Sequence, residues 1–291
     1  MPDTIRSIVR RFPGTPTLEG AGVHLRRSFS NAEVPLFDPF LLLDRFGSAN
    51  PEDYLAGFPW HPHRGIETIT YVLHGRVEHG DTLGNTGVIA HGDVQWMNSG
   101  SGIVHQEMPK RTEGTFDGFQ LWLNRPAREK MAPPAYRGLT QGEIPRVRTE
   151  RGGEVKVVAG SFGGAEGPVQ GISVEPEYLD VALTPGERLE LPVPRGRTAF
   201  AHGIDGSGSF DGSAVDPVTR GETVLFGDGA VVRTHAGDSG MRFLLASGRP
   251  LHEPVAWYGP IVMNSREELA TALLELRRGD FIKERGPPRE L

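Results

Sequence analysis

The chain has 291 residues, a formal net charge of −6 and 37% hydrophobic residues, enough for one large packed domain or two of medium size. It has no cysteine, which excludes disulfides, thiolate nucleophiles and zinc–thiolate sites. The negative charge argues against direct nucleic-acid binding, and no apolar run of about 18 residues predicts a membrane helix. The N-terminus shows no apolar secretion signal, so we expect a cytoplasmic protein.

The first half of the sequence predicts short strands joined by glycine-containing turns. The apolar run at residues 40–43 ends at Asp44 and predicts a buried strand. Further strands are expected at residues 66–73, 77–79, 87–90, 94–97 and 119–124. Residues 125–136 are rich in proline and charge, which is typical of a linker or a covering segment.

The second half, from about residue 145 to 247, predicts another set of strands followed by one helix. Ser265 and Glu268 form a capping box at the start of this helix, and Gly279 offers a stop. Three leucines spaced i, i+4 and i+7 give the helix an apolar stripe, which we expect to pack against β structure: Leu269, Leu273 and Leu276.

Two pairs of candidate metal ligands lie in the first half, each spaced i and i+2. They are His61 with His63, and His105 with Glu107. Side chains two residues apart in a strand point to the same face, so two neighbouring strands would bring together three imidazoles and one carboxylate. This set suits a divalent transition metal. Three other histidines lie beside glycines and are expected to be exposed turn residues: His74, His79 and His91.

The two halves resemble an eroded internal repeat. Residues 61–75 align without a gap on residues 192–206, so that Arg64 and Gly65 match Arg195 and Gly196. In the second copy prolines, a threonine and an alanine replace the four candidate ligands: Pro192, Pro194, Thr234 and Ala236. The repeat therefore predicts a second half with the same fold and no metal. Two histidines of this half are then not ligands: His235 and His252.

Several segments together resemble the pirin family of the cupin superfamily: LFDPFLLLDRF, FPWHPHRGIETITYVL, GDVQWMNSGSGIVHQEMP, FQLWLN and EPVAWYGPIVMN. The resemblance implies an all-β bicupin, two β-sandwich barrels of jelly-roll type with a short C-terminal helix. The expected domains are a metal-binding barrel at residues 1–135 and a degenerate barrel with the terminal helix at residues 136–291. The resemblance also implies one metal ion per chain, usually Fe(II), with Mn, Ni, Cu or Zn as alternatives. Its ligands would be His61, His63, His105 and Glu107.

The general cupin pattern would instead use Glu67 as the carboxylate ligand. The i+2 pairing of Glu107 with His105 favours Glu107. Glu67 would then support the site by holding an imidazole N–H or Arg64. Arg64 itself would steer an anionic substrate or form a salt bridge with Glu67. Three aromatic residues are candidates for the apolar wall of a substrate pocket, or for plain core: Phe46, Trp60 and Trp96.

The ligand set and the resemblance leave two main classes of function. The first is a dioxygenase of the quercetin 2,3-dioxygenase type that uses O₂ and a flavonol or other enol as small-molecule substrate, with Glu107 as catalytic base. The second is a metal- or redox-sensing regulatory protein without turnover, which binds a transcription factor or a metabolic enzyme as partner. A third class is an isomerase that uses a redox-inert metal as a Lewis acid. An apolar cavity beside the metal would favour the enzyme.

Overall fold

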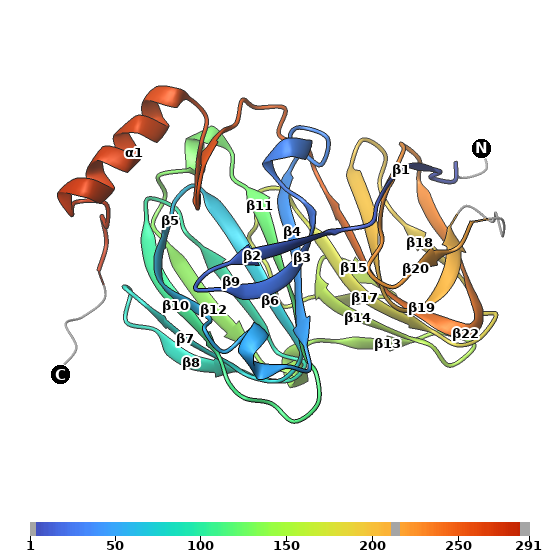
Figure 1. Cartoon of the computed structure of the whole chain (residues 1–291). Coiled ribbons are helices and arrows are strands. Elements are labelled where there is room, and N and C mark those ends of the chain that lie inside the picture. The colour runs from blue at the N-terminus through green and yellow to red at the C-terminus, as the bar shows by residue number, and fades with distance from the viewer. Residues whose placement is uncertain (1–3, 211–215, 286–291) are drawn as a thin grey trace. The chain divides into compact units, whose positions relative to one another are not determined.

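The structure is a computed structural model that describes residues 4–210 and 216–285. It is built mostly of β-strands, as predicted, and divides into two compact units (Figure 1). The unit that we call the first barrel comprises Thr15–Val34, Phe40–Gln141 and Leu251–Leu291. The second barrel comprises Met1–Gly14, Pro35–Pro39 and Gly142–Pro250. Across the described residues, every helix is too short or too polar to cross a membrane.

The first barrel consists of two antiparallel sheets (Figure 1). One sheet has seven strands in the order β12-β9-β6-β11-β4-β3-β2, and the other has four in the order β5-β10-β7-β8. Part of the space between them is filled by an apolar cluster that includes Val72, Val77 and Phe116. The strands are β2 (Thr15–Glu19), β3 (Val23–Phe29), β4 (Phe40–Ser48), β5 (Phe58–His63), β6 (Ile66–His74), β7 (Val77–Asp81), β8 (Thr86–Ile89), β9 (Val94–Asn98), β10 (Ile103–Pro109), β11 (Phe116–Asn124) and β12 (Ala135–Leu139).

The second barrel repeats the strand order of the first. Its main sheet runs β1-β21-β19-β22-β17-β14-β13, so β21, β19, β22, β17 and β14 correspond to β9, β6, β11, β4 and β3. The matched Gly65 and Gly196 both have left-handed backbone, with φ of 77° and 76°, just before β6 and β19. The strands are β1 (Ile8–Phe12), β13 (Arg146–Arg148), β14 (Glu154–Ala159), β17 (Glu177–Leu183), β18 (Arg188–Pro192), β19 (Thr198–Phe210), β20 (Val218–Thr219), β21 (Thr223–Phe226) and β22 (Val231–Gly248). A small hairpin of β15 (Ser161–Phe162) and β16 (Ala165–Glu166) completes this barrel.

The helix α1 (Arg266–Arg278) begins and ends as the sequence predicts. Ser265 and Glu268 form the capping box, and Gly279 closes the helix with a φ of 80°. The helix contacts the hairpin of β23 (Ala256–Tyr258) and β24 (Ile261–Met263). Leu269 and Leu273 pack into the apolar cluster formed there, whereas Leu276 stays 37% exposed, so only part of the predicted stripe is buried.

The compact units differ from the predicted domain boundaries in four segments. Two segments predicted in the first domain, Met1–Gly14 and Pro35–Pro39, belong to the second barrel. β12 pairs with β9, so the first barrel continues past residue 135 and ends near residue 141. The C-terminal hairpin and helix, predicted as part of the second domain, belong to the first barrel. The chain therefore returns to the first barrel after it has completed the second.

Residues 125–136 belong to the first barrel, so of the two predicted alternatives, a linker or a covering segment, the linker was wrong. They contain a single 3₁₀ turn, Ala127–Glu129, and the first strand residues of β12. Arg125 and Lys130 are buried in the first barrel. Their charges are compatible with burial because Glu67, Asn124 and backbone carbonyls bind them. Charged residues in a segment therefore predict solvent exposure only when the interior of the barrel offers them no opposite charge or hydrogen-bond acceptor.

Candidate metal centre

Three of the four predicted ligands come together between β5 and β10. These strands pair antiparallel, and His105 lies opposite His61. The ligand nitrogens of His61, His63 and His105 all lie within 4.8 Å of one another. The ring centroids are 4.3 Å apart for His61 and His105, and 5.0 Å apart for His63 and His105. Alternation of side chains along the two strands thus produces the histidine cluster that the spacing predicts.

The hydrogen bonds of the three imidazoles fit a metal ion. His61 donates from Nδ1 to the Pro59 carbonyl at 2.9 Å, and His63 donates from Nδ1 to the Pro260 carbonyl at 3.2 Å. In a neutral imidazole whose Nδ1 donates, Nε2 keeps its lone pair for a metal, and the two Nε2 atoms lie 3.1 Å apart. His105 is completely buried, and neither of its ring nitrogens has a hydrogen-bond partner among the described residues. A buried imidazole without partners is costly unless it binds something.

Burial also favours the protonation state that binds metal. Loss of solvent, with a smaller contribution from the neighbouring His61, holds the pKa of His63 well below its usual range. Burial does the same to the pKa of His105, with further contributions from His61, His63 and His79. Both rings are therefore neutral at pH 7, and a metal ion does not have to displace a proton from them.

Glu107 lies on the same strand but outside the histidine cluster. The register between β10 and β5 shifts between His105 and Glu107. Oε1 of Glu107 accepts hydrogen bonds from Thr70 Oγ1 at 3.1 Å and from Gln95 Nε2 at 3.0 Å. Oε2 has a longer contact, 3.5 Å, with Gln120 Nε2. Glu107 is thus a buried carboxylate with one well-held oxygen and one less tightly held oxygen.

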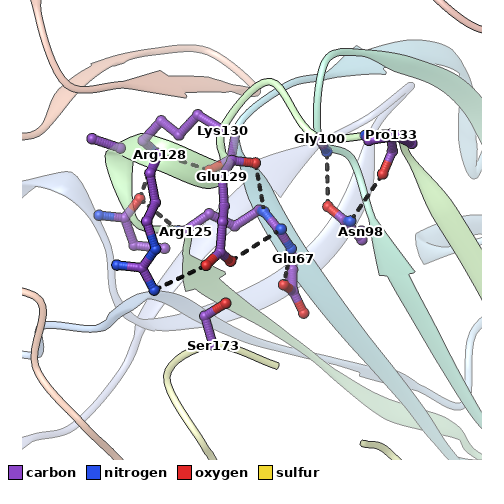
Figure 2. A network of polar contacts seen from close by, with 12 residues as sticks. Glu67, Asn98, Gly100, Arg125, Arg128, Glu129, Lys130, Pro133 and Ser173 are labelled. Atoms are coloured by element: carbon purple, nitrogen blue, oxygen red, sulfur yellow. Dashed lines mark hydrogen bonds and ion pairs between the residues drawn. The ribbon is translucent and has the colours of Figure 1, made fainter. Parts of the chain in front are cut away.

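Glu67 binds neither an imidazole nor Arg64, so the predicted supporting contacts were wrong. Its Oε2 accepts from the indole of Trp96 at 2.8 Å, and its Oε1 pairs with Arg125 (Figure 2). Burial raises the pKa of Glu67, and the charge of Arg125 opposes that shift. Arg64 pairs instead with Glu275 at 2.7 Å. The turn at Gly65 separates β5 from β6 and directs the two side chains to different partners.

A pocket of about 490 Å³ opens beside the cluster within the first barrel. His61, His63 and Glu107 line it, together with polar groups that include Arg27, Asp44 and Gln120. Its apolar wall is formed by aliphatic and aromatic side chains: Leu25, Leu42, Phe46, Phe58, Trp122 and Trp257.

Only one of the three predicted pocket aromatics lines this pocket. Phe46 does, whereas Trp60 is 51% exposed and Trp96 is bound to Glu67. Alternation could have excluded Trp60, because it precedes His61 and must point to the other face of β5. The same rule could have found Trp122, which shares a face of β11 with Gln120. Nothing in the sequence indicated that Trp257 lines this pocket, because it lies after the residues of the second barrel and far from the ligand strands in sequence.

His79 is buried, contrary to the prediction that it is an exposed turn histidine. It lies on β7 opposite Glu107 of β10, and its ring centroid is 5.5 Å from that of His105. Its Nε2 lies 3.1 Å from Asp81 Oδ2, and its ring stacks on Tyr136 at 4.3 Å. The strand β7 extends to Asp81, two residues beyond its predicted end, which carries His79 inside the barrel. His74 and His91 are exposed, as predicted.

The repeated barrels and the histidine cluster define a two-domain cupin protein with a candidate metal site in its first barrel. The family model of pirin matches residues 22–123, and the model of the pirin C-terminal cupin domain matches residues 178–282. The chain belongs to the pirin family.

Relatives match along nearly the whole chain. A pirin-like protein of Caulobacter vibrioides is 44% identical over 278 residues, which cover 95% of this chain and 99% of the relative. A crystal structure of quercetin 2,3-dioxygenase from Acinetobacter baumannii matches with a TM-score of 0.87 and 30% identity, covering 95% of this chain and 98% of that one. A bacterial pirin from Escherichia coli in complex with nickel(II) matches with a TM-score of 0.64 and 22% identity, covering 81% and 95%; this likeness shows the fold alone.

Proposed function

We propose that this protein is a metal-dependent dioxygenase that opens the ring of a flavonol or a similar enol, as a quercetin 2,3-dioxygenase does. The observation that carries the proposal is the pocket of about 490 Å³, whose lining includes both ligand-type side chains and aromatic rings. A flat aromatic substrate fits such a pocket, whereas a protein that only senses metal does not need one. The likeness to the dioxygenase structure from Acinetobacter baumannii supports the same assignment.

The proposed metal ligands are His61, His63, His105 and Glu107, and the proposed ion is one Fe(II) per chain. Bound iron would supply a redox-active centre that couples oxidation of an enol to reduction of O₂. A set of imidazoles and one carboxylate without thiolate also suits manganese, nickel, copper or zinc.

Glu107 is the proposed base that takes the proton of the substrate enol. Glu107 lines the pocket. Thr70 and Gln95 hold its Oε1, whereas among the described residues its Oε2 has only the 3.5 Å contact with Gln120. Oε2 is therefore the oxygen that accepts the proton. The two bonds on Oε1 keep the carboxylate in place while this happens.

The aromatic side chains of the pocket orient the substrate and exclude water. Trp122 meets the ring of His63 edge to face at 5.1 Å, and Trp257 lies 6.0 Å from Trp122. Arg27, which lines this pocket, is paired with Asp44 at 2.7 Å and also with a second carboxylate, Glu19. These contacts favour a neutral planar enol that loses its proton inside the pocket, over a substrate that enters as an anion.

Oxygen uptake tests the proposal. Protein purified without air and loaded in turn with iron, manganese, nickel or copper is mixed with quercetin in an oxygen electrode. We expect at least the iron form to consume O₂ and to release carbon monoxide as the co-product of ring opening. If every form is inert, and a protein partner instead binds the ferrous and ferric forms with different affinity, the protein is a regulatory binder and the enzyme proposal is wrong.

A further inference from the structure

The C-terminal segment of the chain reaches the strand that carries His61 and His63. The backbone N–H of Val262 donates to the carbonyl of Arg64 at 3.1 Å, and residues 64 and 261 form a parallel bridge. The Pro260 carbonyl accepts the bond from His63 Nδ1. The segment after the second barrel thus supplies both a backbone partner for the ligand strand and the acceptor that orients one ligand.

Arg64, directly after His63, is fixed from the other side by the end of α1. Its side chain is only 2% exposed. One guanidinium nitrogen pairs with Glu275 at 2.7 Å, and another donates to the Phe281 carbonyl at 2.8 Å. The guanidinium carbon lies 4.2 Å from the centre of the Phe281 ring. Glu275 in turn pairs with Lys283 at 2.9 Å, so the buried Arg64 lies in a network of opposite charges.

We propose that Arg64 is a positioning residue: held by Glu275 and Phe281, it fixes the end of β5 so that His63 keeps its bond to Pro260 and presents Nε2 to a metal. The inference rests on the proposed metal site. An acceptor on the far nitrogen of a ligating imidazole sets the tautomer and the ring orientation, and losing such support typically lowers metal affinity. Here the acceptor belongs to the hairpin on which α1 packs, and Arg64 ties that helix to the ligand strand.

The side chain at position 64 must bind a carboxylate, a carbonyl and a ring face at once. The planar, forked guanidinium of arginine does this, whereas the single ammonium group of lysine cannot reproduce it. Arg64→Lys therefore keeps the positive charge and removes the planar, forked arrangement of donors. Glu275→Gln keeps most of the shape of the partner and removes its charge.

Titration with Co(II) tests the proposal without any enzyme assay. Wild-type protein freed of metal is compared with Arg64→Lys and Glu275→Gln. We expect Co(II) affinity to fall by about 10–100-fold in both variants, and the visible absorption bands of bound Co(II) to shift, because the orientation of one imidazole changes. Arg45→Lys is the matched control, since Arg45 forms a two-bond ion pair with Asp117 in the same barrel, at 3.0 and 2.8 Å. The control should change neither readout.

The outcomes separate three cases. If Arg64→Lys does not fold, Glu275→Gln decides alone, because Glu275 is near the surface and glutamine still fits there. A folded variant with a lower melting temperature but unchanged Co(II) affinity and spectrum would show that the Arg64 contacts only stabilise the fold, and would overturn the proposal. If wild-type protein does not bind Co(II) at all, the proposed metal site fails, and the positioning role fails with it.

Discussion

Lys130 offers the sharpest test of how the first barrel is held together. Lys130 is 1% exposed, and its ammonium group donates three hydrogen bonds, to the Gly65 carbonyl at 2.8 Å, to Asn124 Oδ1 at 2.7 Å and to the Val262 carbonyl at 2.9 Å. Lys130→Met keeps most of the length of the side chain and removes the donor of the two carbonyls, whereas Asn124 Oδ1 still accepts from the Arg125 N–H. Each unsatisfied group costs about 1–3 kcal/mol, and partial relaxation brings the expected loss of unfolding free energy to about 2–4 kcal/mol.

Urea unfolding of Lys130→Met and of Lys110→Met measures this loss against a matched control. Lys110 pairs with Glu78 at 2.6 Å, but both side chains are about half exposed, 48% and 51%. An exposed pair of this kind contributes about 0–1 kcal/mol, so Lys110→Met should unfold almost as wild type does. If the two variants lose the same free energy of unfolding, the three bonds of Lys130 do not stabilise the barrel, and the reasoning fails.

Three further predictions concern the candidate metal centre. Changing His61, His63 or His105 to alanine should each abolish stoichiometric metal binding while the second barrel still folds; metal analysis that finds two ions per chain, or full occupancy in His105→Ala, would contradict the single site. Glu107→Gln should lower turnover of quercetin by about 10²–10⁴-fold, the range for loss of a general base, whereas Glu67→Gln should mainly destabilise the fold, because it weakens the buried pair with Arg125. The pH dependence follows from the lowered pKa values of His63 and His105: the unfolded chain binds protons below about pH 6.5 and the folded one does not, so the metal-free protein should lose stability as the pH falls from 7 to 5. Thermal melts across that range check the sign, and the His105→Ala variant should show a weaker dependence.

Most of the fold could be predicted from the sequence because its elements follow two simple periodicities of apolar residues, two residues in strands and about 3.6 residues in the helix. Each expected strand of the first half is present, and the helix begins and ends at the predicted Ser265 and Gly279. The return of residues 251–285 to the first barrel was not predicted. The local sequence of a hairpin and a helix does not indicate against which of the two barrels they pack. The linker alternative for residues 125–136 failed for a related reason: the partner of Arg125 is Glu67, which lies 58 residues earlier.

For the candidate site, sequence spacing predicted which residues of one strand share a face, and it missed the contacts that residues of other strands make with them. The i and i+2 rule brought His61 and His63 to one face, and the pairing of β10 with β5 added His105. Glu107, the i+2 partner of His105, lies outside this cluster. The rule could not show that Gln95 and Gln120, from two other strands, would hold Glu107. Contacts of this kind depend on register between strands that are not adjacent in sequence.

Comparison of the two barrels separates the residues that hold the fold from those that hold the site. β6 and β19 both follow a left-handed glycine and pair with equivalent neighbours, so the backbone bonds are alike in both barrels. At the position that Glu107 takes in the first barrel, the second has Ala236, which packs in an apolar cluster with Phe210 and Phe243. Strand pairing uses backbone groups, so it does not depend on whether this position is a glutamate or an alanine. A buried polar cluster, in contrast, needs a hydrogen-bond partner for each of its members. At this position the second barrel therefore keeps its fold without a carboxylate, because Ala236 packs among apolar side chains and needs no hydrogen-bond partner.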